Sequence, residues 1–257
     1  MSYSIDLGNG IELQLVPVYA GRFLMGSKET DQNALPDEKP LHEVVLADYW
    51  IGKNPVTVSQ YARFVEVSGY KYQFKQNLTS KANHPMAGLT WEDAQAFCAW
   101  IGGRLPTEAE WEKAARGTDG RTYPWGDKWF TNNANTDELG IEGTSPIFLC
   151  PKGVSPYGCL DMSGNVWEWC SDWYAKNYYK RSPSVSPQGP EKGFYRVIRG
   201  GSWANLPKDC RITRRGAYIG NAQNFDVGFR IVYTQISGEQ KKLEILWLSL
   251  NTPCFYL

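Results

Sequence analysis

Alternation of hydrophobic and polar residues predicts strands towards both ends of the chain. Residues 11–16 read Ile-Glu-Leu-Gln-Leu-Val, and this alternation is typical of a half-buried strand. Residues 20–27 indicate a second strand that enters a loop, and the stretch 41–51 indicates a third. Strands are expected again at 194–199 and 227–234.

Three short helices are predicted from signals at their N-termini. Each begins with a threonine that is followed three residues later by Gln, Asp or Glu, which is the capping-box pattern. The three pairs are Thr57 with Gln60, Thr90 with Asp93, and Thr107 with Glu110. Apolar residues follow each pair at helical spacing, and a glycine ends each helix. We interpret the acidic residues at the start of the third helix (Glu108, Glu110 and Glu112) as favouring the helix dipole.

Residues 118–188 are expected to be mostly irregular because they are rich in Gly, Pro, Asn and Trp. A loop region of this length inside a compact domain usually indicates function or bound ions. No repeat and no sharp change in composition divides the chain, so we expect one domain over 1–234 and a C-terminal tail over 235–257. The apolar stretch 243–250 in the tail would dock a partner or cover the domain's own core, and the sequence leaves both readings open.

The charge balance excludes several classes of partner. The 257 residues include 27 basic and 27 acidic side chains, so the chain lacks the basic surplus that nucleic-acid binding requires. No apolar run reaches membrane-spanning length, so membrane insertion is not expected. The N-terminus lacks the features of a signal peptide, which favours a cytoplasmic protein with six reduced cysteines. The oligomeric state stays open.

Six separated motifs, in order, carry a resemblance to one known family. They lie at 21–27, 55–57, 103–112, 123–126 (Tyr-Pro-Trp-Gly), 164–169 (Gly-Asn-Val-Trp-Glu-Trp) and 199–203 (Arg-Gly-Gly-Ser-Trp). On these residues the chain resembles the formylglycine-generating enzyme (sulfatase-modifying factor) superfamily over residues 10–233. The resemblance implies an α+β, C-type lectin-like fold with twisted antiparallel strands, flanking helices and much irregular structure. Function does not follow from the fold and has to be argued from the site.

The resemblance places two cysteines of the family's enzymes, which hold copper, in the segment after Arg-Gly-Gly-Ser. In this chain the second of them falls on Cys210 and the first on Asn205, while Ser202 matches the active-site serine. A carboxamide oxygen is a poor ligand for copper(I), so copper is not expected and Ser202 and Cys210 are interpreted as vestigial. The alternative is a copper-dependent oxidoreductase that modifies a substrate cysteine through Cys210 and a further partner. Iron held by three histidines, as in a related branch, is excluded within this chain because it has only two histidines.

The same resemblance implies structural calcium in two loops. The first loop pattern matches at Asp161, Gly164, Val166 and Glu168. The second loop pattern matches at Asn135, Thr136 and Ile141, with Glu138 or its neighbour Asp137 replacing a missing carboxylate. Carboxylate and carbonyl oxygens are the ligands that calcium prefers, and the ions would order loops that have no strand ladder.

Residues 204–226 are predicted to form a binding surface. Non-enzymatic relatives often carry an asparagine-rich stretch of this length between the same flanking motifs, and in the variable proteins of diversity-generating retroelements its AAC codons are mutated at adenines. On that pattern, thirteen positions would vary and contact ligand: Ala204, Asn205, Leu206, Asp209, Arg214, Gly216, Ala217, Tyr218, Ile219, Ala222, Asn224, Phe225 and Asp226. Every residue type among them is reached from AAC by changing adenines alone.

The composition of 204–226 independently favours recognition. Tyr218, Ile219 and Phe225 are large apolar residues among glycines and asparagines, in a stretch without helical or strand periodicity. Such aromatics on irregular backbone are typical of adaptable binding sites. We therefore expect a non-catalytic protein that binds a macromolecular ligand, and we expect that ligand to be a protein. Two alternatives stay open, an ordinary loop at 204–226 and an accessory domain that regulates a partner enzyme.

Overall fold

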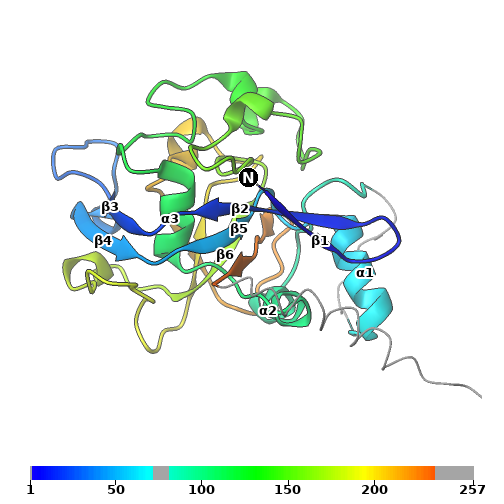
Figure 1. Cartoon of the computed structure of the whole chain (residues 1–257). Coiled ribbons are helices and arrows are strands. Elements are labelled where there is room, and N and C mark those ends of the chain that lie inside the picture. Colours follow the sequence, from blue (N-terminus) through cyan, green and yellow to red (C-terminus); the bar gives the residue numbers. More distant parts are fainter. Residues whose placement is uncertain (1, 72–80, 235–257) are drawn as a thin grey trace, which may run out of the picture.

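The computed structural model describes residues 2–71 and 81–234 (Figure 1). Its strands are β1 (Tyr3–Asp6), β2 (Glu12–Val18), β3 (Gly21–Met25), β4 (His42–Leu46), β5 (Tyr49–Gly52), β6 (Trp167–Trp173), β7 (Arg196–Arg199), β8 (Arg215–Tyr218), β9 (Val227–Gly228) and β10 (Val232–Tyr233). Its α-helices are α1 (Val58–Ser68), α2 (Trp91–Trp100) and α3 (Glu108–Arg116). Short 3₁₀ helices are η1 (Pro36–Glu38), η2 (Thr131–Asn133), η3 (Asp137–Leu139), η4 (Pro151–Gly153), η5 (Tyr178–Lys180) and η6 (Pro207–Cys210). The predicted tail, 235–257, lies outside the described residues.

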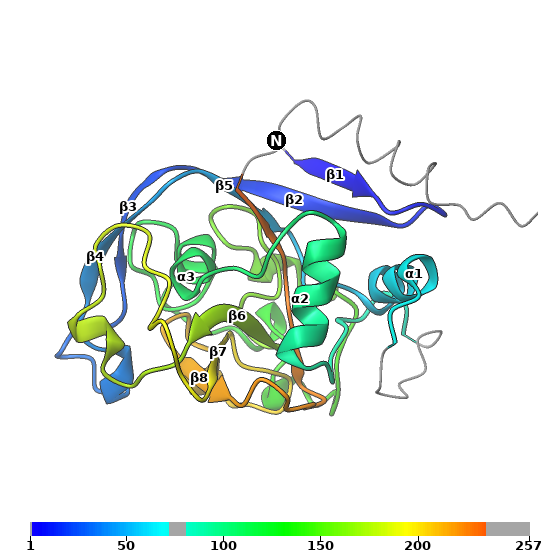
Figure 2. The same ribbon diagram turned by 90° about the horizontal axis from the view of Figure 1, so that it is seen from below.

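The strands form three small sheets. A four-stranded sheet has the order β1-β2-β5-β10 and joins the two ends of the described chain, and a hairpin pairs β3 with β4. The second four-stranded sheet has the order β8-β7-β6-β9, in which only the short β6–β9 pair is parallel. Helix α3 lies between the β3–β4 hairpin and this second sheet, and it contacts β3, β6 and β7 (Figure 2).

The capping boxes predicted for the three helices are confirmed. Thr57, Thr90 and Thr107 are the N-caps, and each hydroxyl accepts the backbone N–H three residues on. Each of these N–H groups would otherwise lack a partner at the helix start. At the other end of α1, Gly69 adopts the left-handed conformation with φ of 68° and its N–H donates to the carbonyl of Val65. Local sequence therefore specifies where these helices begin.

Two hydrophobic clusters make up the core. One packs α1 and α2 against β2 and the second sheet, with Phe97, Trp169 and Phe229 fully buried. The other surrounds Trp111 of α3 between the hairpin and the same sheet. Burial of one such large apolar side chain contributes about 1.5–3 kcal/mol, so packing from separate elements decides the architecture.

The strand predictions for 41–51, 118–188 and 227–234 need correction, and β1 was not predicted. The stretch 41–51 is two strands, β4 and β5, and 227–234 is the two short strands β9 and β10. Strand β6 lies inside the stretch that was predicted to be irregular. It was missed because five of its seven residues are buried and its burial does not alternate along the strand. The remainder of 118–188 contains only turns, short 3₁₀ helices and isolated bridges.

Candidate functional site

The segment 204–226 connects the end of β7 to β9 and carries two regular elements. It forms η6 first and then β8, which pairs antiparallel with β7 from Arg215 opposite Arg199 to Tyr218 opposite Arg196. The expectation of a segment without strand periodicity was therefore wrong for 215–218. The sequence Arg-Gly-Ala-Tyr hides this strand because glycine and arginine are poor strand signals, and the arginine owes its buried position to a distant partner.

Exposure divides the segment into an outer and an inner set of side chains. All thirteen predicted ligand-binding positions lie in the described chain, and none of them is buried. Phe225 is 67% exposed, and Leu206, Ile219 and Tyr218 are exposed by 45%, 38% and 36%. The buried residues of the segment are all non-candidates: Cys210, Arg211, Ile212, Thr213 and Arg215. We call the thirteen candidate positions the outer side of the segment and its five buried residues the inner side.

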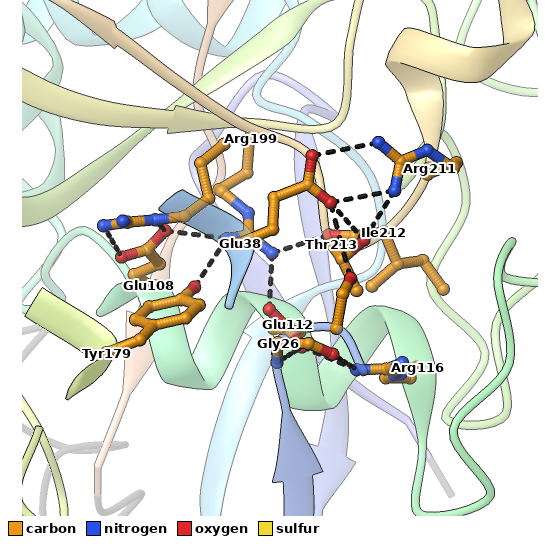
Figure 3. Close-up of polar contacts among 12 residues, drawn as sticks. Gly26, Glu38, Glu108, Glu112, Arg116, Tyr179, Arg199, Arg211, Ile212 and Thr213 are labelled. Atoms are coloured by element: carbon orange, nitrogen blue, oxygen red, sulfur yellow. Dashed lines mark hydrogen bonds and ion pairs between the residues drawn. The ribbon is translucent and has the colours of Figure 1, made fainter. Parts of the chain in front are cut away.

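Buried ion pairs hold the inner side of the segment. The Arg211 guanidinium donates to both carboxylate oxygens of Glu38 at 2.8 and 2.9 Å, and the Thr213 hydroxyl donates to Glu38 at 2.8 Å (Figure 3). Arg215 makes the same two-pronged contact with Glu108 of α3 at 2.7 and 2.9 Å. Burial raises the pKa of Glu38, but hydrogen bonds and charge from Arg211 outweigh it and the pKa lies below its ordinary value.

Arg199 of the Arg-Gly-Gly-Ser motif connects this inner side to α3. Its guanidinium donates to Glu108 at 2.7 Å, to Glu112 at 2.6 Å and to the carbonyl oxygen of Ile212 at 2.6 Å (Figure 3). Glu112 also accepts from Arg116 at 3.0 Å. The interpretation of Glu108 and Glu112 as residues that favour the helix dipole was therefore incomplete, since both are buried partners of arginines from other elements.

Ser202 is fully buried and joins the two ends of the segment. Its Oγ lies 2.9 Å from Oδ1 of Asn205 and 2.9 Å from Oδ2 of Asp226. The backbone N–H of Ser202 also donates to Oδ1 of Asn205 at 2.9 Å. Two of the thirteen candidate positions thus have their side chains engaged in closing the segment.

Both histidines lie in the described chain, and neither is hydrogen-bonded to Ser202. His42 contacts the carbonyl of Pro40, and His84 contacts the hydroxyl of Thr144.

Cys210 is buried and its Sγ packs against Gly201. A side chain at Gly201, whose φ is 74°, would collide with this sulfur. Burial, followed by the charge of Asp209, raises the pKa of the Cys210 thiol well above its usual range. The thiolate is the form that attacks substrates and binds metals, so this cysteine is arranged as a neutral packing group. The other described cysteines are also free and buried, and Cys254 lies outside the described residues.

The first predicted calcium loop has one carboxylate that no arginine binds. Asp161 is buried with φ of 55° and accepts from Nδ2 of Asn165 at 3.2 Å, and burial raises its pKa to about 7. Glu168 gives both oxygens to Arg230 at 2.6 Å each, and Trp111 Nε1 donates to one of them at 2.7 Å. The backbones of the matching Gly164 and Val166 lie in the same buried turn.

The second predicted calcium loop brings together fewer ligands. Oδ1 of Asn135 and Oγ1 of Thr136 are buried without a hydrogen-bond partner among the described residues. Glu138 instead accepts from Trp129 Nε1 at 2.8 Å, and Ile141 is 42% exposed. Within 2–71 and 81–234, no group of three or more His, Cys, Asp or Glu side chains could hold a metal ion. The donors fit calcium only in part, and calcium stays a prediction carried mainly by Asp161.

A hollow of about 370 Å³ beside the inner side was not foreseen from the sequence. Arg116, Arg211 and Thr213 line part of it, next to the polar loop at 27–31. The two arginines are already paired with Glu112 and Glu38, so neither of them offers an uncompensated charge to a ligand in this hollow. Among the described residues, no helix has the length and apolar character needed to cross a membrane.

Comparison with known proteins identifies relatives over most of the chain. The family model described as "Sulfatase-modifying factor enzyme 1-like domain" matches residues 11–235. The serine/threonine-protein kinase pkn1 of Chlamydia caviae is 38% identical over 239 residues, which cover 84% of this chain and 37% of that protein. The formylglycine-generating enzyme of Streptomyces coelicolor is 32% identical, with 82% of this chain and 86% of that enzyme covered. The chain thus spans little more than a third of the kinase and most of the enzyme.

Solved structures support the same fold. PvdO from Pseudomonas aeruginosa superposes with a TM-score of 0.77 at 25% identity, covering 90% of this chain and 97% of that one. Treponema denticola variable protein 1 has a TM-score of 0.71 at 24% identity, with 91% and 99% covered. The predicted α+β, C-type lectin-like fold of the formylglycine-generating enzyme type is confirmed.

Proposed function

The chain belongs to the sulfatase-modifying factor enzyme 1-like domain family, and because Asn205 stands where its copper-binding enzymes have a cysteine, we propose that it is a non-catalytic binding domain. Its ligand is a protein, which contacts the outer side of residues 204–226. The observation that carries the proposal is the division of this segment: every buried residue is a non-candidate, and every candidate has exposed surface.

The two residues at the positions of the family's copper-binding cysteines argue against catalysis. Asn205 offers a carboxamide that is already bonded to Ser202, and Cys210 is buried as a neutral thiol. Copper(I) prefers soft thiolate ligands, and neither group supplies one. The network around Arg199, Arg211 and Arg215 instead gives a rigid base from which exposed side chains vary without loss of the fold.

Copper titration combined with a cysteine-containing peptide tests the absence of catalysis. We expect no tight copper(I) binding and no conversion of the peptide thiol to an aldehyde. The Streptomyces coelicolor enzyme, assayed in parallel, is the positive control. Tight binding and aldehyde formation by the wild type, both lost in Cys210→Ser, would establish the oxidoreductase alternative and contradict the proposal.

The finer proposal is that a retroelement diversifies the segment. The similarity in fold to the Treponema variable protein agrees with this but does not carry it; the residue types at the thirteen positions do. Sequencing the locus from many cells is expected to reveal a near-copy of the DNA for 204–226 beside a reverse-transcriptase gene. Adenines should stand in that copy at the differing positions. A locus with no such copy would leave a binding surface of fixed sequence.

A second candidate function is an accessory domain of a signalling protein. It is favoured by the relative from Chlamydia caviae, which is named a kinase and matches this chain over only 37% of its length. In this reading the same outer surface would contact a kinase or its substrate. It predicts stoichiometric co-purification with one protein from the source cell, and loss of that complex when Tyr218, Ile219 and Phe225 are changed to alanine.

A further inference from the structure

Several outer strands of this protein are covered on their open side. Val45 of β4 donates its N–H to the carbonyl of Ser184 at 2.7 Å and accepts from Ser186 at 3.0 Å. Val232 of β10 exchanges both backbone hydrogen bonds with Arg104, at 2.7 and 3.0 Å. Natural proteins cover edges in this way because a row of unpaired N–H and C=O groups recruits other chains. An uncovered edge in this molecule therefore needs an explanation.

Strand β8 is the outermost strand of its sheet, and no other described strand pairs with its open side. Among the described residues it pairs only with β7, and the Arg214 guanidinium donates to the carbonyl of Arg215 at 3.2 Å. Successive residues of an antiparallel strand direct their backbone groups to opposite sides, so half of those in β8 face away from β7. Strand β1 is also outermost, but its exposed side chains, Ser4 and Asp6, are polar.

The side chains along β8 do not protect the edge. Residues 216–219 read Gly-Ala-Tyr-Ile and include no charge and no proline, which are the usual protective residues. The charge of Arg215 is buried against Glu108 and does not reach the open side. Tyr218 and Ile219 keep 36% and 38% of their surface exposed. Small and apolar residues thus leave this edge without the charges and prolines that usually protect one.

More apolar surface lies at the end of β8. Phe194 and Tyr195, which are 72% and 45% exposed, precede Arg196 of β7, whose pairing partner is Tyr218. Their rings contact each other edge to face at 5.0 Å between centroids. These two aromatic residues are not among the thirteen candidate positions, and they extend the candidate surface across the strand pair.

We propose that the protein ligand adds an extended segment to the open edge of β8. This inference rests on the proposed function, because 216–219 are four consecutive candidate positions. Backbone groups of β8 pair with the ligand whatever side chains stand at these positions, while Tyr218, Ile219 and the Phe194–Tyr195 pair select its side chains. Such a division lets affinity persist while specificity changes. An extended polypeptide fits this edge because its own backbone donors and acceptors match those that β7 leaves unpaired.

A library of random linear peptides displayed on phage provides the probe. Peptides selected on the wild-type chain are then measured for binding to Tyr218→Ala/Ile219→Ala, which changes only exposed side chains and is expected to melt like the wild type. Each peptide bond of a selected peptide is then N-methylated in turn. We expect about tenfold weaker binding at every second position, because only alternate N–H groups donate to β8. Hydrogen exchange at 216–219 should slow when the peptide is bound.

The outcomes separate this inference from the function beneath it. Peptides that need Tyr218 and Ile219 but show neither alternation nor slowed exchange would overturn strand addition and leave the binding surface standing. Peptides that bind wild type and variant equally would overturn both. A selection without binders would also contradict strand addition, because backbone pairing accepts many sequences and the library supplies extended chains.

Discussion

At the scale of single residues, Asp172 of β6 shows how burial governs a carboxyl group. It accepts the N–H of Glu108 at the start of α3 at 2.9 Å and the Ser171 hydroxyl at 3.1 Å. Burial first, and then the negative charge of Glu108, raise its pKa to about 7. The folded chain therefore binds a proton that the unfolded chain releases near pH 4, so this group lowers the stability as the pH rises from about 4 to 7.

The variant Asp172→Asn is expected to be more stable than the wild type at pH 8, by up to about 4 kcal/mol. The amide oxygen still accepts the N–H of Glu108, and no buried charge has to form. At pH 4 the two proteins should differ little. Urea unfolding across pH 4–8 measures this, with the exposed Asp6→Asn as control. An Asp172→Asn protein that is less stable at pH 8 would show that the charged form is needed.

Ser202 gives a second prediction at this scale. Replacement by alanine removes the hydroxyl that lies between Asn205 and Asp226, at the two ends of the segment. We expect a loss of about 1–2 kcal/mol in the free energy of unfolding and faster hydrogen exchange at the ends of 204–226. Ser4→Ala, on the exposed face of β1, should change neither quantity. Unchanged exchange in Ser202→Ala would show that the segment is held by its inner arginines alone.

Some residue roles could not have been read from the sequence. The motif around Glu168 predicted a calcium ligand, but Arg230, far along the chain, takes both of its carboxylate oxygens. Cys210 was interpreted as vestigial because its partner cysteine is replaced by Asn205, and in the structure it lies buried. A pattern within a motif shows which chemistry is available there. It does not show which charged residue from a distant part of the chain will pair with the residues of the motif.

At the scale of elements, α3 shows both the reach and the limit of local patterns. Its capping box was legible, because Thr107 and Glu110 satisfy each other within one turn. Its burial was not, because Glu108 is held by Arg199 and Arg215 from strands that follow much later in the chain. Strand β8 was missed for the same reason. Its first residue, Arg215, is buried because it pairs with Glu108, and this partner lies far away in the sequence.

The variant Glu108→Gln is expected to lower the free energy of unfolding by about 3–5 kcal/mol, because it leaves two buried guanidinium groups without their shared carboxylate. The effect should be seen as a lower urea midpoint with an unchanged slope. Glu66→Gln, which breaks the exposed pair with Arg63, is the control and should cost less than about 1 kcal/mol. Similar losses in both variants would mean that the buried network does not anchor α3.

At the scale of the whole molecule, the fold was predictable mainly from the order of six motifs rather than from periodicity. The predicted helices were confirmed, while β6, β8 and the breaks in two predicted strands depend on contacts between distant segments. The candidate surface could be assigned from residue types. Its division into an outer and an inner side needed the positions of Arg211, Thr213 and Arg215 in space. This division therefore depends on long-range ion pairs and could not be predicted from the sequence.

Calcium supplies a prediction for the whole molecule. Asp161 is the carboxylate of the predicted loops that lies buried without an arginine hydrogen-bonded to it, so we expect weak binding, with a dissociation constant of about 1 mM. Saturating calcium should then raise the melting temperature of chelator-treated wild type but not that of Asp161→Asn, since a ligand stabilises only the state that binds it. Magnesium, which demands a smaller octahedral site, is the control ion. An equal rise in both proteins would place the ion elsewhere, and no rise in either would show that the buried ion pair of Glu168 with Arg230 orders this region without metal.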